Sequence, residues 1–169
     1  MEEVNSRPIS FKWALIFAMT SLVYTLGVAI ARVQVPQLLN WLIGVSIISL
    51  AFFMALKEYK TANEGQISFG KGFGMSMFIA SVGGVIRAIV FYVYMTVDPE
   101  YLKFVQEVAQ NNSFGPPPDP SAQEQMEGIM NFVMSAEFFS AVGFIMAILA
   151  GLILGAIVSA ILKTEEEEF

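Results

Sequence analysis

The chain has 169 residues, of which 56% are hydrophobic, and its formal net charge is −6. It contains neither cysteine nor histidine, which excludes thiol nucleophiles, disulfides, zinc sites of the Cys/His type and Ser-His-Asp catalysis. Binding to a nucleic-acid backbone needs clustered Lys and Arg, and the sequence has no such cluster. We therefore expect no metal centre, no cofactor and no nucleic-acid partner.

Four apolar runs make up most of the chain, at 13–31, 38–56, 73–97 and 138–162. Crossing the hydrocarbon core of a bilayer takes about 20 mainly apolar residues at about 1.5 Å each, and each run approaches or exceeds that length. The first run is also longer than the apolar core of a signal peptide, about 7–15 residues, so we expect a retained helix. The sequence predicts one all-α domain, an integral membrane four-helix bundle whose main partner is the lipid bilayer.

The distribution of basic residues predicts the orientation of the bundle. Short loops rich in Lys and Arg stay in the cytoplasm. Placing both termini there gives the cytoplasmic side six basic residues and the opposite side two. The six are Arg7, Lys12, Lys57, Lys60, Lys71 and Lys163, and the two are Arg32 and Lys103. We expect both termini, including the acidic tail at 163–169, to be cytoplasmic.

The segment 98–137 between the last two runs is predicted to form a two-helix cap on the extracytoplasmic side. Asp98-Pro99-Glu100 has the residues of a helix start, with Asp as N-cap and Pro in the first helical position. Residues 115–120 (Gly-Pro-Pro-Pro-Asp-Pro) favour an extended bend. Ser121 and Glu124 form a capping box that begins a second helix, which we expect to continue into the fourth run. The cap covers the mouth of the bundle or lies in the interface; a ligand lid or a docking platform is the alternative.

Small residues recur every fourth position in the third and fourth runs. This spacing places them along one ridge of each helix, where helices in lipid can approach closely. We expect the two ridges to pack against each other, with a homodimer contact as the alternative. The ladder of the third run begins just before it at Gly72 and continues with Ser76, Ala80, Gly84 and Ala88. The fourth run contributes Gly143, Ala147, Gly151, Gly155 and Ser159.

Arg87 is the only formal charge inside the four runs. A charge at the centre of a bilayer costs about 2.5–3.5 kcal/mol on insertion scales, so such a residue is a functional candidate by default. Counting helical rise from the cytoplasmic lysines places Tyr24, Asn40 and Trp41 near its level. Tyr24 and Asn40 are candidate hydrogen-bond acceptors, and Trp41 is a candidate stacking face. Glu137 is the natural ion partner, although an ideal bundle places it about 15 Å higher.

Three roles remain open for Arg87. It could be a structural clamp, part of a site for an anionic ligand or lipid headgroup, or part of a transport path. A membrane enzyme would need a carboxylate pair or a nucleophile–base pair in the bundle, and we find neither. We therefore expect a non-enzymatic protein, either an accessory subunit of a membrane partner or a binder of lipid or another small ligand. A small oligomeric transporter or channel is the second hypothesis.

The combination of several short motifs resembles a known family. The stretch 66–73 (Gln-Ile-Ser-Phe-Gly-Lys-Gly-Phe), Asp98-Pro99-Glu100 after the third run, and the glycine-laddered fourth run before a charged tail occur together here. This combination is similar to a bacterial family of small four-helix membrane proteins, common in Bacteroidetes and known only as a domain of unknown function, DUF4199. The resemblance implies a four-helix membrane fold and a bacterial cytoplasmic (inner) membrane. It implies no activity.

Overall fold

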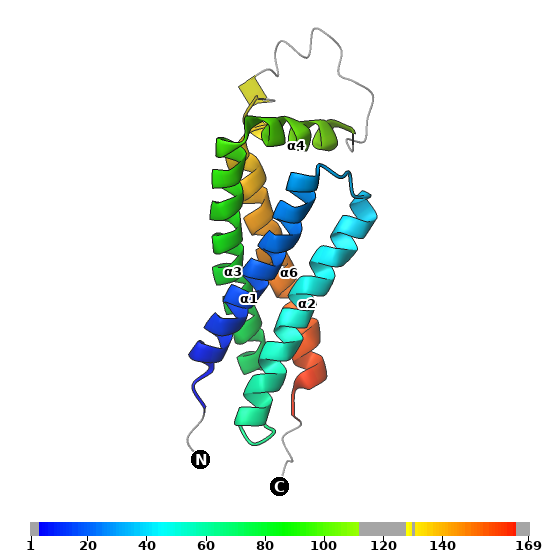
Figure 1. The fold of residues 1–169 in the computed structure, drawn as a ribbon. Helices are drawn as coiled ribbons and strands as arrows, with labels where there is room; N and C mark the ends of the chain where they lie inside the picture. The colour runs from blue at the N-terminus through cyan, green and yellow to red at the C-terminus, as the bar shows by residue number, and fades with distance from the viewer. Residues whose placement is uncertain (1–3, 112–127, 130, 165–169) are drawn as a thin grey trace.

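A computed structural model describes residues 4–111, 128, 129 and 131–164, and these residues form helices and connecting turns without strands. The long helices lie side by side, and a shorter helix lies across one end of them (Figure 1). The helices are α1 (Ser6–Ala31), α2 (Gln37–Ala62), α3 (Phe69–Val97), α4 (Pro99–Asn111) and α6 (Ala136–Leu162).

The four long helices have the length and composition of membrane spans. They contain 26, 26, 29 and 27 residues, hence about 39–44 Å at about 1.5 Å per residue. Large apolar side chains cover their outer surfaces; Val23 is 71% exposed and Leu38 is 70% exposed. An apolar surface of this extent is typical of helices that face lipid. The chain is thus an all-α protein with the features of a multi-pass membrane protein.

The helices extend further than the apolar runs suggested. Helix α1 begins at Ser6 rather than at 13, and α2 continues to Ala62 rather than ending at 56. Asn5 caps α1 by accepting a hydrogen bond from the Arg7 N–H, and Ser68 caps α3 in the same way. Hydropathy marks only the part of a helix that suits hydrocarbon, whereas the caps determine where the helix itself begins.

The long helices alternate in direction and do not pack equally. Helix α6 lies antiparallel to α3, while α1 packs against α3 and α2 against α1, α3 and α6 (Figure 1). The start of α1, the α2–α3 turn and the end of α6 meet at one end. There the Thr164 N–H donates to the Ile67 carbonyl at 2.9 Å, and Lys60 Nζ donates to the Leu162 carbonyl at 3.0 Å. The main core, including Phe52, lies towards this end.

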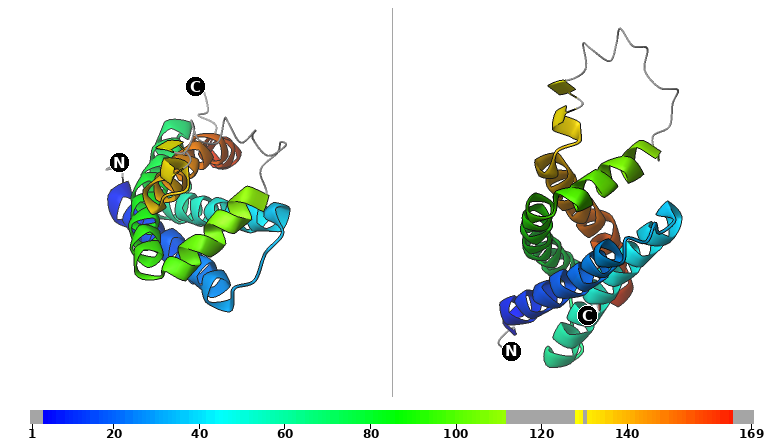
Figure 2. Two further views of the ribbon diagram at one scale, coloured as in Figure 1. Left: turned by 90° about the horizontal axis from the view of Figure 1, so that it is seen from above. Right: turned by 45° about the horizontal axis from the view of Figure 1, so that its top comes forward.

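Helix α4 lies across the opposite end of the bundle and extends towards the start of α2 (Figure 2). As predicted, Pro99 begins the helix, and the Asp98 side chain accepts a hydrogen bond from the Tyr101 N–H at 3.1 Å. The predicted extended bend at 115–120 and the first part of the predicted second cap helix, at 121–127, lie outside the described residues. The expected continuation of that helix into the fourth span is wrong, because a turn at Met134 and the N-cap Ser135 begin α6 separately.

Candidate functional site

The small residues of α3 and α6 meet in antiparallel register, and we call this contact the seam. Four pairs form it: Gly72 with Ser159, Ser76 with Gly155, Ala80 with Gly151, and Gly84 with Ala147. A Cβ atom built on Gly151 would lie 2.7 Å from the Ala80 Cβ, and one on Gly155 would lie 2.8 Å from the Ser76 Cβ. At these positions the two backbones approach too closely for any side chain larger than hydrogen on α6.

The next pair in this register would be Ala88 with Gly143, and at this level the guanidinium of Arg87 enters the contact. Its Nη2 donates to the Gly143 carbonyl at 3.3 Å. A Cβ atom built on Gly143 would lie 3.2 Å from the same nitrogen. Gly143 therefore leaves room for the guanidinium, and the seam determines the level at which Arg87 sits.

Arg87 has few protein partners. The two ion pairs formed by the described residues are Lys12–Glu58 and Arg32–Glu100, and neither includes it. A guanidinium carries five N–H donors, and among the described residues the Gly143 carbonyl is its one hydrogen-bond acceptor. The side chain is half-buried. The remaining donors are available to a further group.

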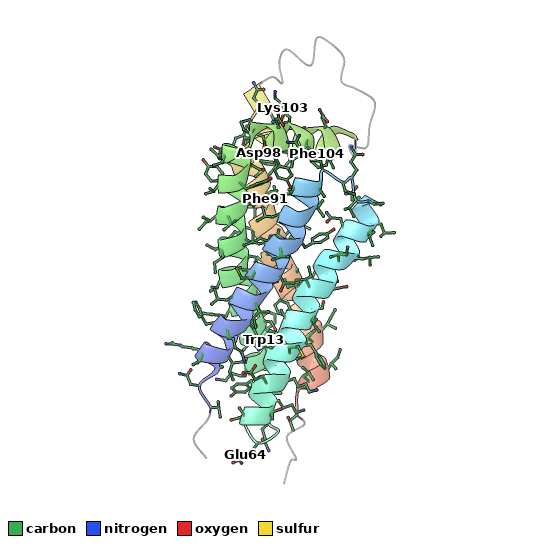
Figure 3. All side chains as sticks on the ribbon, viewed as in Figure 1. Trp13, Glu64, Phe91, Asp98, Lys103 and Phe104 are labelled. Carbon is green, nitrogen blue, oxygen red and sulfur yellow. The ribbon has the colours of Figure 1, made fainter. Side chains whose placement is uncertain are left out.

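On its other side Arg87 lines a cavity of about 340 Å³ beneath α4, which we call the roofed cavity. Helix α1, the α1–α2 connection and α2 form its other walls, and the apolar stripe of α4 forms its roof. Figure 3 shows Phe91 on α3 below Phe104 on α4, at the end of the bundle remote from Trp13. The lining residues are Ser21, Leu22, Tyr24, Thr25, Val28, Val33, Gln34, Val35, Asn40, Gly44, Ile47, Arg87, Phe91, Tyr101, Phe104, Val105 and Val108.

A comparison with known protein families identifies the family of this chain. The model of a family described as "Protein of unknown function (DUF4199)" matches residues 12–164. This range includes all but the first six residues of α1, the other helices and the lining of the roofed cavity. The chain belongs to the DUF4199 family. No curated protein and no solved structure matches it significantly.

Two of the residues predicted at the level of Arg87 line the roofed cavity of this DUF4199 protein. The Tyr24 hydroxyl donates to the Asn40 Oδ1 at 2.9 Å, which links α1 to α2. The bond leaves the Asn40 amide hydrogens and a lone pair of the Tyr24 oxygen available to another group. With Arg87, these side chains bring polar groups from three helices to the cavity: donors on Arg87 and Asn40, and an acceptor on Tyr24.

The structure does not bring the other two predicted residues to the roofed cavity. Trp41 is 58% exposed on the outer surface of α2 and does not line the cavity. Glu137 lines a separate groove between α3 and α6, where it accepts a 3.4 Å hydrogen bond from the Tyr92 hydroxyl. The predictions that Trp41 is a stacking face for Arg87 and that Glu137 is its ion partner are therefore wrong.

Helix α4 is fastened over the cavity by contacts that the sequence analysis did not anticipate. Arg32 Nη2 lies 2.8 Å from Glu100 Oε2, and the hydrogen bond to Glu100 raises the pKa of the Arg32 guanidinium. Gln106 Nε2 donates to the Met134 carbonyl at 2.7 Å. These pairs join segments that are remote in sequence. They could have been predicted only if α4 had been known to lie across the end of the bundle.

Tyr101 is the main buried side chain of the roof. It is 6% exposed, and the centroid of its ring lies 4.9 Å from the ring centroid of Tyr94. Burial, together with a smaller effect of Tyr94, raises the pKa of the Tyr101 hydroxyl to about 12. At neutral pH the hydroxyl is therefore uncharged, and among the described residues Arg87 is the only charged side chain that lines the cavity.

Proposed function

We propose that this DUF4199 protein is a non-enzymatic membrane protein that binds a lipid or another small ligand in the roofed cavity. One observation carries the proposal. Among the described residues, Arg87 is the only charged side chain that lines the cavity, and it makes a single hydrogen bond, of 3.3 Å. A bound ligand would supply the acceptors that the described protein groups do not.

The geometry favours a binding role for Arg87 over a structural clamp. A clamp that holds a guanidinium inside a membrane should satisfy most of its donors, because unpaired buried polar groups are costly. The bond to the Gly143 carbonyl is longer than the usual range of about 2.7–3.2 Å. It holds the guanidinium in position and leaves most of its hydrogen-bonding capacity unused.

The lining supports binding rather than acid–base catalysis. The amide of Asn40 and the guanidinium of Arg87 can donate hydrogen bonds to a ligand, and the Tyr24 oxygen, whose proton is donated to Asn40, can accept one. The described lining residues include no Asp or Glu, whereas general acid–base catalysis in a chain without histidine relies mainly on carboxylates. These groups are suited to holding an anionic or strongly polar headgroup.

We place the protein in a bacterial cytoplasmic membrane with both termini in the cytoplasm. Six Lys and Arg residues lie on or next to the turns where α1 begins, α2 ends, α3 begins and α6 ends, whereas Arg32 follows the other end of α1 and Lys103 lies on α4. The positive-inside rule then orients the bundle. The cavity would lie in the outer half of the membrane, and α4 would cover it from the extracytoplasmic side.

The proposal is tested by extracting the full chain with its native lipids and identifying what remains bound. The wild type should retain a defined small molecule or lipid by native mass spectrometry, and Arg87→Gln should lose it while keeping its helical circular dichroism. Lys57→Gln is the matched control, because it removes one positive charge from an exposed position outside the cavity.

Three outcomes would contradict the proposal. If Arg87→Gln fails to fold, the result supports a structural role for Arg87 as a clamp, and the ligand site loses its main support. If both variants retain the same molecules as the wild type, the cavity is not the binding site. If a protein partner co-purifies and no small ligand does, an accessory subunit becomes the better description.

A further inference from the structure

We infer that the ligand is a monoanionic amphiphile, which reaches the roofed cavity sideways from the membrane past Gly44. The inference rests on the proposed function and adds to it a chemical class and a route. Two sources share this chemistry: the carboxylate of a fatty acid and the phosphodiester of an anionic phospholipid. Charge, the apolar lining and the position of the opening each support one part of the inference.

The charge of the lining argues for one negative charge on the ligand. Arg87 is the only formally charged side chain among the described lining residues. In a low-dielectric cavity one guanidinium can balance one negative charge, often through two parallel hydrogen bonds. A second negative charge would be buried there without a counter-charge, which is costly. A monoanion therefore matches this cavity better than a dianion such as a phosphate monoester.

The rest of the lining argues for an attached apolar group. Aliphatic and aromatic side chains line the cavity around Arg87, contributed by all its walls and by the roof; they include Leu22, Val28, Ile47, Phe91, Phe104 and Val108. A small hydrophilic anion would leave this apolar surface uncovered. A hydrocarbon group would cover it and gain the free energy of apolar burial.

The roof argues against access from the water above. Tyr101, Phe104 and Val105 of α4 line that side of the cavity. Arg32 and Gln106 fasten the helix at the bonds to Glu100 and Met134. These contacts hold α4 between the cavity and the solvent.

The exposed part of the lining lies on α2 and the α1–α2 connection. Gly44 is exposed, and a Cβ atom built on it would meet nothing within 4 Å. It lies seven residues into α2, hence about 10 Å below the start of that helix. Its neighbours Trp41 and Leu42 are exposed apolar side chains, as expected for a surface in lipid. An opening at this level faces the bilayer, so a lipid could enter without leaving it.

The test uses the full chain in nanodiscs of zwitterionic phosphatidylcholine, with bound lipid measured by native mass spectrometry. The probes are oleate, phosphatidylglycerol, the neutral oleyl alcohol and inorganic phosphate. We expect one oleate or one phosphatidylglycerol to bind per chain. Oleyl alcohol should bind at least about tenfold more weakly, because a charge-assisted hydrogen bond is lost. Inorganic phosphate should not bind. Oleate alone would identify a carboxylate ligand, and phosphatidylglycerol alone a phosphodiester.

Two glycine variants test the route. Gly44→Leu places a side chain at the opening and should slow or weaken binding of the anionic lipid several-fold. Gly27→Leu is the matched control, because Gly27 is also an exposed helical glycine with nothing within 4 Å of its built Cβ, and it does not line the cavity. Circular dichroism checks that both variants fold.

The outcomes separate this inference from the proposed function. Equal binding of oleyl alcohol would overturn the monoanion while leaving a lipid-binding cavity. Tight binding of inorganic phosphate would overturn the amphiphile. Unchanged binding in Gly44→Leu would overturn the route. If the wild type binds none of the four probes while a different small molecule co-purifies with it, the ligand class is wrong and the cavity remains a site. If nothing binds or co-purifies at all, both proposals fail.

Discussion

The seam and the roofed cavity are both contacts of α3, and they differ in the size of the residues that face each other. Along the seam, glycine, alanine and serine let the backbones of α3 and α6 meet. Beneath α4, large side chains such as Phe91 and Tyr101 hold the elements apart around about 340 Å³ of space. Small residues therefore give this bundle a closely packed half, which we call the rigid half, and large residues with one arginine give it a half that contains a cavity.

The largest expected effect comes from filling the seam. In Gly151→Leu the new Cβ would lie 2.7 Å from the Ala80 Cβ, and overpacking of this kind costs about 3 kcal/mol or more when neither backbone can move. We expect loss of the folded monomer, measured by size-exclusion chromatography and by thermal unfolding followed with circular dichroism. Gly74→Leu is the control, because a Cβ on this α3 glycine meets nothing within 4 Å.

The same variant separates the two uses predicted for the ladders. If they served a homodimer instead, Gly151→Leu would leave a stable, folded monomer and abolish only self-association. That result would contradict a seam formed within one chain.

A smaller effect is expected when the charge beneath the roof is removed. In Arg87→Met the bundle loses one long hydrogen bond to Gly143 and no longer holds a guanidinium at membrane depth. Because these terms oppose each other, we expect the free energy of unfolding to change by less than about 1 kcal/mol, or to rise. Unfolding in mixed micelles measures it. A loss of several kcal/mol would make Arg87 part of the rigid half of the molecule.

The bond between Tyr24 and Asn40 should contribute less again. Hydrogen bonds between membrane helices average about 0.6 kcal/mol in double-mutant cycles. We expect a coupling energy of this size between Tyr24→Phe and Asn40→Leu, from a cycle of unfolding measurements. A coupling energy above about 1.7 kcal/mol would exceed the range known for such bonds and would mean that the wall of the cavity is as firmly joined as the seam.

Much of the rigid half was predictable, because a four-residue spacing of small side chains maps directly onto one helix face. The level of Arg87 was predictable for a related reason. Rise per residue is nearly constant, so counting from the lysines placed Tyr24 and Asn40 at the correct end. What counting cannot supply is rotation. Trp41 follows Asn40 by one residue, and each residue along a helix turns the side-chain direction by about 100°. The Trp41 side chain therefore points to the outer surface.

The roof was predictable only in part. The start of α4 at Asp98-Pro99-Glu100 follows from local chemistry, and that prediction was correct. The Arg32–Glu100 bond and the exposure of Gly44 depend on how α4 and α2 lie relative to α1. No local pattern in a single sequence encodes that arrangement, so these features emerge only from the structure.

The smallest effect is one that appears only in alkali. The pKa of Tyr101 is about 12 in the fold, against about 10 for an exposed tyrosine. The folded state thus favours the uncharged hydroxyl, so the stabilisation is fully present below pH about 10 and is lost as the pH rises through about 12. We expect the roof to loosen over that interval, measured as faster amide exchange in α4. Tyr101→Phe cannot ionise at this position, so it should lose much of the increase in amide exchange. An equal increase in both proteins would mean that another group causes the loosening.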